Sequence, residues 1–215
     1  MEEKIINGIF DLLDEWRGYS AYQLERRADI YFAFYIKEIL NGKKRCEIDF
    51  VLPEFPVMKG ILDDSDDVKS FRIDYLAYSK ASGKVFLVEL KTDINSKYSY
   101  QEEYLHKAKE KNINKLVGGL LKIYDATKSK EKYKRYLKKL SEIGWIKFDN
   151  SGKPINTSGD YEVEVIYILP NNSNDDANVI SFDDIRDYLK DNKDFITQRF
   201  LKSLKAWEVN PNISD

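Results

Sequence analysis

Three residues of this chain combine side chains and a spacing that could do chemistry. Asp74 is followed, after a gap of fourteen residues, by the sequence Glu89-Leu90-Lys91. The segments around them are rich in β-branched and aromatic residues, and Ser82-Gly83 separates the two, so the pattern predicts a β-hairpin. A tight turn at Ala81-Ser82 pairs the strands symmetrically about itself, which sets Asp74 directly opposite Glu89.

The predicted hairpin brings like charges together. Side chains alternate along a strand, so Glu89 and Lys91 share a face. Two carboxylates roughly 5 Å apart on neighbouring strands repel each other and destabilise the hairpin. A divalent cation bound between Asp74 and Glu89 would turn that repulsion into attraction. The pattern therefore predicts a metal site.

The order Asp74, then Glu89-Leu90-Lys91, resembles the Asp…(Asp/Glu)-x-Lys signature of the PD-(D/E)XK nuclease superfamily, which has the restriction-endonuclease-like fold. The resemblance implies that Asp74 and Glu89 bind Mg²⁺, with Mn²⁺ as a substitute and the Leu90 carbonyl as a further ligand. It also implies that Lys91 positions or activates the attacking water. Carboxylates suit this hard ion, which lowers the pKa of bound water. Ile73 stands where the name-giving proline would be.

A solvated strand face is the alternative to a metal site, and the flanking residues argue against it. Apolar residues occupy both faces of the predicted hairpin: Ile73, Phe86, Val88 and Leu90 on one, and Leu76, Val85 and Leu87 beside the acids on the other. Charges in such a strand are costly unless they are paired or bound to metal.

Glu25 is a third candidate metal ligand. Members of the superfamily often contribute an acid from the helix before the strands, and Glu25 lies near the start of a predicted helix at the edge of its apolar stripe. The alternative is an acid of the first turn that the helix dipole favours. The sequence leaves the two readings open.

Gln101 and Tyr104 follow Lys91 on the next predicted helix. They are similar to the Gln…Tyr element of the exonuclease-like branch of the superfamily, where the glutamine orients the site near the scissile phosphate. The resemblance implies a role in substrate binding. Otherwise these two are surface and core residues of an ordinary helix.

Charge suggests where nucleic acid would bind. The chain carries a net charge of −2, but Lys97 to Lys139 holds thirteen Lys and Arg against five Asp and Glu, a local charge of +8. Lys132, Lys134 and Arg135 alternate there with tyrosines, which suits phosphate contact and base stacking. A lysine-rich solvated helix face is the alternative.

The 215 residues suffice for one sizeable core, so a single domain is expected, with a nuclease-like core at about 20–170 and helical additions at 1–18 and 180–215. The only cysteine, Cys46, and the absence of a long apolar run favour a cytoplasmic protein. Periodicity predicts the following elements: helices at 2–16, 20–39, 100–124, 129–142, 181–191 and 194–207, and strands within 46–59, 71–91 and 161–169.

We therefore expect an α/β protein of restriction-endonuclease-like order: helix, three-strand antiparallel meander, helix, strand. The expected activity is metal-dependent hydrolysis of nucleic acid, DNA rather than RNA. Two alternatives stay open: a degenerate member of the superfamily that binds nucleic acid or protein without cleavage, and an unrelated α/β interaction domain. The sequence leaves open endonuclease or exonuclease action and the oligomeric state, a homodimer included.

Overall fold

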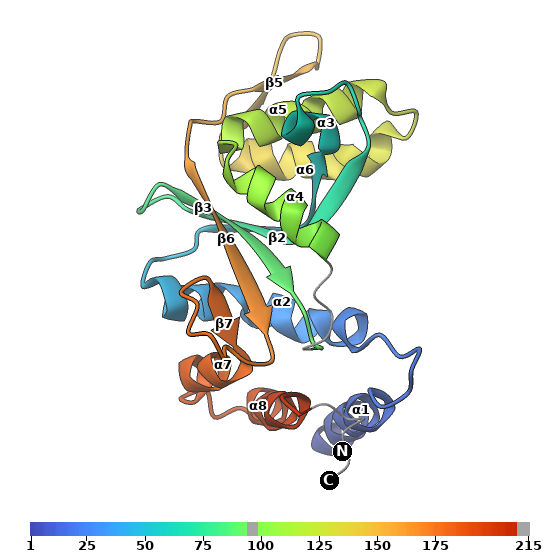
Figure 1. Ribbon diagram of the computed structural model, residues 1–215, viewed down its shortest axis with the longest axis vertical. Coiled ribbons are helices and arrows are strands. Elements are labelled where there is room, and N and C mark those ends of the chain that lie inside the picture. The colour runs from blue at the N-terminus through green and yellow to red at the C-terminus, as the bar shows by residue number, and fades with distance from the viewer. Residues whose placement is uncertain (94–98, 210–215) are drawn as a thin grey trace. The chain divides into compact units, whose positions relative to one another are not determined.

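The computed structural model describes residues 1–93 and 99–209, without the side chains of residues 99–101. Within these ranges the chain is an α/β protein with eight helices, a mixed five-stranded sheet and a separate two-stranded sheet (Figure 1). The predicted α/β class is therefore confirmed. None of these helices combines the length and the apolar character that a membrane span requires.

The helices are α1 Glu2–Trp16, α2 Leu24–Lys44, α3 Lys59–Asp63, α4 Ser99–Lys109, α5 Ile113–Ala126, α6 Lys130–Glu142, α7 Phe182–Leu189 and α8 Phe195–Trp207. The strands are β1 Phe50–Met58, β2 Ser70–Ser79, β3 Lys84–Leu90, β4 Ile146–Phe148, β5 Pro154–Asn156, β6 Glu162–Leu169 and β7 Val179–Ser181. The large sheet has the strand order β1-β2-β3-β6-β7.

The chain divides into two compact units, each assembled from separate stretches of sequence. Unit 1 comprises Met1–Glu47, Leu90–Lys97 and Ile166–Asp215, and unit 2 comprises Ile48–Glu89 and Tyr98–Val165. The two units thus alternate along the chain, with boundaries at the end of β3 and within β6. The single domain inferred from chain length stays a prediction.

Unit 2 is built on the antiparallel meander β1-β2-β3, with α5 and α6 packed against β1. The prediction of one helix over 100–124 is wrong, because this segment forms two helices, α4 and α5, separated at residues 110–112. Asn112 begins the second helix by accepting a hydrogen bond from the Lys115 amide, which satisfies a donor that a helix start leaves open.

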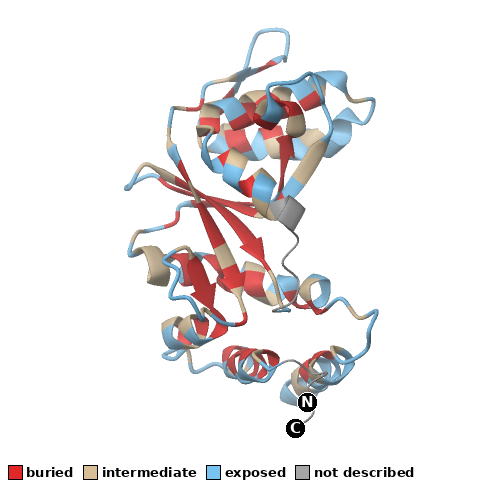
Figure 2. Cartoon of the chain, in the orientation of Figure 1, coloured by how far each residue is buried: buried red, intermediate tan, exposed pale blue. Residues whose placement is uncertain are grey.

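Unit 1 gathers both ends of the chain. Helix α1 packs against α8, α7 packs against α2, α8 and β7, and β6 pairs with β7 in parallel. Strand β7 was not among the predicted elements. The buried residues of the large sheet follow its strands, including both faces of β3 (Figure 2).

Candidate functional site

The hairpin of β2 and β3 has the predicted register. Its pairs run from Tyr75 opposite Val88 to Ser79 opposite Lys84, symmetrically about the Ala81–Ser82 bond. The connection is longer than the tight turn of the prediction, since it spans 80–83 and ends on Gly83 at a φ of 64°. Glycine adopts this left-handed conformation at little cost. Because the register is unchanged by the longer connection, the predicted register is confirmed over the pairs from Tyr75 to Ser79.

One step beyond the last pair, the register sets Asp74 opposite Glu89. Residues directly opposite on antiparallel strands point to the same face. Glu89 is only 2% exposed, whereas Asp74 is half-buried. The neighbouring pair on the same face, Leu76 and Leu87, is fully buried. The acids therefore stand at the end of an apolar row, where an ionised carboxylate is costly without compensation.

The chemistry of this pair suits a hard divalent ion. Carboxylate oxygens are the ligands that Mg²⁺ prefers, and the ion keeps several waters, so two acids can suffice as protein side chains. Across the described ranges, no group of three or more His, Cys, Asp or Glu has a geometry that would hold a metal ion. Of the predicted set, the hairpin thus supplies two carboxylates, Asp74 and Glu89, and metal binding stays a prediction.

Strand β1 carries an acid that the sequence reasoning missed. Glu54 lies between Pro53, which pairs with Tyr75, and Phe55, which pairs with Ile73, so it occupies the position opposite Asp74. Its φ of 53° departs from strand geometry, and its exposed carboxylate lies 4.0 Å from the Arg72 guanidinium. The only sequence signal was the Pro-Glu-Phe-Pro run, which gives no register. Glu54 therefore faces solvent and Arg72 rather than completing a three-acid cluster.

Lys91 is the first residue after β3, and it lies in unit 1. Its backbone N–H donates to the Ile168 carbonyl at 2.9 Å, which fixes the backbone at the root of its side chain. Its ammonium Nζ lies 3.6 Å from Glu25 Oε1, and the Lys91 side chain is 13% exposed. An ion pair this sheltered is screened less than one on the open surface. Lys91 therefore has a fixed backbone and a charged partner on α2.

Glu25 reaches Lys91 from the first turn of α2. Burial raises the pKa of the Glu25 carboxyl above its ordinary value, while the Lys91 charge pulls it down. The first-turn position also agrees with the helix-dipole alternative. Glu25 thus lies beside Lys91, and its role as a metal ligand stays a prediction.

Tyr104 and Gln101 both belong to α4. The ring of Tyr104 stacks on Phe71 with 5.2 Å between centroids, and the Lys59 ammonium lies 4.9 Å from the same ring. These contacts account for the ring as a packing group of unit 2, and the substrate role of Tyr104 stays a prediction. The side chain of Gln101 falls outside the described residues.

Helix α6 displays the predicted basic residues. Leu137 and Leu140 are its buried anchors, whereas Lys132, Lys134 and Arg135 are all exposed. Lys134 forms an ion pair with Glu131 on the same helix. Of the three predicted residues, Lys132 and Arg135 therefore keep their charge unpaired by an acid of α6.

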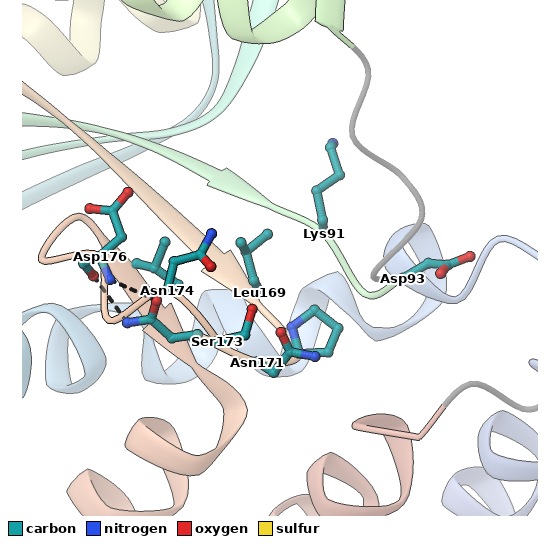
Figure 3. A pocket seen from close by; sticks show the side chains of 10 residues that line it. Lys91, Asp93, Leu169, Asn171, Ser173, Asn174 and Asp176 are labelled. Carbon is teal, nitrogen blue, oxygen red and sulfur yellow. Dashed lines mark hydrogen bonds between the residues drawn. The ribbon is translucent and has the colours of Figure 1, made fainter.

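A pocket of about 220 Å³ opens beside Lys91 in unit 1. Figure 3 shows Lys91 and Asp93 extending from the chain after β3, while the other labelled residues come from the end of β6 and the loop after it. That loop contains the run Asn171-Asn-Ser-Asn-Asp-Asp176. Sequence reasoning missed it, because a polar run after a strand is equally typical of a solvated turn.

Comparisons with protein-family models, with curated proteins and with solved structures found no match. What the chain does must therefore be inferred from its own residues and their geometry.

Proposed function

We propose that this chain is a metal-dependent nuclease of the PD-(D/E)XK type, which hydrolyses phosphodiester bonds in nucleic acid, DNA rather than RNA. The observation that carries the proposal is the hairpin register, which sets Asp74 opposite the buried Glu89. A buried carboxylate opposite a second acid on the neighbouring strand is costly, and a cation bound between the two would offset that cost.

The order of the elements supports the same proposal. A helix, α2, precedes the antiparallel meander β1-β2-β3. The helices α4 to α6 and the small strands β4 and β5 then come before β6, which adjoins β3 in the sheet. Figure 1 shows β3 and β6 side by side and running in the same direction. We include in the proposal that this arrangement is the restriction-endonuclease-like core, with α1, β7, α7 and α8 as additions.

The residues would divide the work as follows. Asp74, Glu89 and the Leu90 carbonyl would hold Mg²⁺, which lowers the pKa of a bound water and stabilises charge on the phosphate. The Lys91 ammonium would orient the attacking water and offset the charge that develops on the phosphoryl oxygens. Glu25, 3.6 Å from that ammonium, would hold the Lys91 side chain aligned. Lys132 and Arg135 on α6 would contact phosphates of the strand.

The decisive experiment is cleavage of labelled DNA and RNA with Mg²⁺, with Mn²⁺ and with a chelator. Wild type should cut at least one substrate with either metal, and chelation should abolish cutting. Asp74→Asn and Glu89→Gln should each lower the rate by roughly 10²–10³-fold, as expected for loss of a group that stabilises the transition state. Glu162→Gln, which alters an exposed acid at the start of β6, is the matched control and should retain full activity.

Metal binding can be measured without turnover. Mg²⁺ at about 100 times its dissociation constant should raise the free energy of unfolding of wild type by about 2.7 kcal/mol, and it should leave the Asp74→Asn and Glu89→Gln variants unchanged. If Mg²⁺ and Mn²⁺ stabilise nothing and no substrate is cut, the nuclease proposal fails. Retained nucleic-acid binding would then identify a degenerate binding module.

A further inference from the structure

The pocket beside Lys91 has chemistry that the proposed hydrolysis does not use. It lies where β3 and β6 end, and its lining combines the Lys91 ammonium with a loop rich in asparagine (Figure 3). In open α/β sheets, ligands bind outside the carboxyl ends of the strands. The position of the pocket therefore makes it a candidate binding site in its own right.

Part of the loop serves to hold its own shape. The Asn172 side chain donates to the Asp176 carbonyl at 3.0 Å and accepts from the Asp176 amide at 2.9 Å. Asp176 in turn accepts from the Asn178 amide at 2.8 Å, and Asp175 has a left-handed φ of 49°. Asn172 and Asp176 are thus committed to the loop, which is fixed on the side facing β7.

Three other polar side chains of the loop line the pocket: Asn171, Ser173 and Asn174. All three are exposed. Within the described residues they make no side-chain hydrogen bond with the rest of the protein. A solvated loop would also show such side chains, but it would not gather them around a cavity that includes Lys91. Their donors and acceptors are available to a ligand.

We propose that this pocket binds one nucleotide of the substrate strand, next to the scissile phosphate, with Asn171, Ser173 and Asn174 contacting the base. This inference rests on the proposed function, because Lys91 is the residue that would face the phosphate. An asparagine amide pairs a donor with an acceptor, which matches the edge of a base such as adenine. The carboxylates of Asp93 and Asp176 would repel a second phosphate and so reserve the rest of the pocket for the uncharged base.

The size of the pocket limits what it can hold. Sites for drug-sized ligands have volumes of roughly 300–1,000 Å³, and about 220 Å³ is smaller. A pocket of this volume suits a single base better than a whole dinucleotide or a folded cofactor. The substrate strand would therefore present an unpaired base at this position, as single-stranded or branched nucleic acid does.

The test measures binding and cleavage separately. In a chelator, fluorescence anisotropy would give the affinity of the full chain for short fluorescein-labelled oligo(dA), oligo(dC), oligo(dG) and oligo(dT). Wild type should prefer one base. Asn171→Ala combined with Asn174→Ala should remove that preference and weaken binding of the preferred oligomer by roughly tenfold or more. Asn150→Ala, an exposed asparagine in the β4–β5 turn, is the control and should behave as wild type.

Each outcome decides something. Equal binding by wild type and the double variant, or no binding of any oligomer by wild type, overturns the pocket assignment. If cleavage with Mg²⁺ persists in that case, the proposed nuclease function stands without it. A base preference that depends on the two asparagines, found in a protein that cuts nothing, would instead retain the pocket and overturn the nuclease. Thermal unfolding of the double variant should match wild type, which shows that the loop change is local.

Discussion

At the scale of single residues, the contact between Lys91 and Glu25 ties two predicted site residues together. The two lie 3.6 Å apart although 65 residues separate them in the chain. Lysine can assist a water only if its ammonium is held in one place, and an acid at this distance does that. In the proposed nuclease, Glu25 would therefore position Lys91, which is compatible with its proposed place near the metal.

The raised pKa of Glu25 gives a pH-dependent prediction. Burial raises the pKa of this carboxyl, so the folded state holds the proton more strongly than the unfolded chain does. The stability linked to this group is present below the unfolded pKa and is lost as the pH rises through the folded pKa. Glutamine mimics the protonated acid, so Glu25→Gln should have a higher free energy of unfolding than wild type at neutral pH. In mildly acidic buffer the two should converge.

Urea titrations at the two pH values would measure the difference, with Glu15→Gln on α1, an exposed acid, as the control. A variant less stable than wild type at neutral pH would mean that the attraction of Lys91 outweighs the cost of burial. Cleavage would add a second readout, since a residue that positions Lys91 should shift the pH–rate profile of the proposed nuclease and not only its stability.

The two halves of the candidate site were not equally predictable. The pairing of Asp74 with Glu89 follows from alternation along strands and from a short connection, and both are local in sequence. The approach of Glu25 to Lys91 depends on how α2 packs, and periodicity alone gives no such information. The resemblance to a known superfamily supplied only the expectation that Glu25 is a metal ligand. The loop at residues 171–176 could not be predicted as part of a site, because its composition is the same for a loop that lines a pocket and for a solvated turn.

At the scale of secondary structure, glycine in α2 shows how tertiary packing overrides a local signal. Asn41-Gly42 is typical of a helix end, yet α2 continues to Lys44. A Cβ added at Gly42 would lie 2.5 Å from the ring of Tyr188 on α7. Gly42 therefore serves close helix packing rather than termination, and a single sequence offers no means to tell the two apart.

This explanation predicts opposite effects for two glycines in helices. Gly42→Ala should lower the free energy of unfolding by about 1–3 kcal/mol, as overpacking does. Gly8, on the exposed face of α1, has nothing within 4 Å of an added Cβ, so Gly8→Ala should raise it by about 1 kcal/mol through helix propensity. Chemical denaturation of both variants measures the pair. Stabilisation by Gly42→Ala would contradict the packing explanation.

Other helices and strands were predicted wrongly, or not at all, for related reasons. The break between α4 and α5 depends on Asn112 and on how two short helices pack, while the apolar periodicity of 100–124 is almost continuous. The elements α3, β4, β5 and β7 have three to five residues each. Such lengths are too short for periodicity to reveal. Three longer helices, α1, α6 and α8, agree with their predicted ranges within one residue, whereas α2, predicted over 20–39, spans Leu24–Lys44.

Helix α6 gives a prediction for nucleic-acid binding. If Lys132 and Arg135 contact phosphates, each alanine variant should weaken binding to all sequences alike and reduce the slope of log affinity against log salt by about 0.7–0.9. Lys139, which pairs with Glu142 at 2.9 Å, is the matched control. An anisotropy titration over several salt concentrations measures the slopes. An unchanged slope in both variants would leave α6 as a solvated face.

At the scale of the whole molecule, the organisation of the chain was the least predictable feature. Length and composition predicted one core with additions at the two ends, and this stays a prediction. They gave no sign that two compact units would alternate along the chain, or that the segments 1–18 and 180–215 would pack on each other through α1 and α8. Contacts between residues nearly 190 positions apart leave no periodic trace, since each helix shows only that one of its faces is apolar.

Charged and polar groups fix α1 on α8. Arg199, which is 6% exposed, donates to Asp11 at 2.7 Å and to Asp14 at 2.9 Å. Asp14 also accepts from the Trp207 indole at 2.8 Å and from the Ser203 hydroxyl at 3.1 Å. Asp14 is thus the acid on which the buried polar groups of α8 converge, whereas the Asp11 side chain is 70% exposed.

The two acids should therefore differ sharply when removed. Asp14→Ala leaves a buried guanidinium and a buried indole short of acceptors, and it should lower the free energy of unfolding by about 3 kcal/mol or more. Asp11→Ala removes a mostly solvated partner and should cost less than about 1 kcal/mol. Urea denaturation of both variants and of the double variant measures the contrast. Because Asp11 can compensate in part once Asp14 is gone, the double variant should lose more than the sum of the single losses. Equal single losses would mean that the two acids of α1 are interchangeable, and two losses near zero would mean that α1 is held by its apolar face, through Phe10 and Leu13.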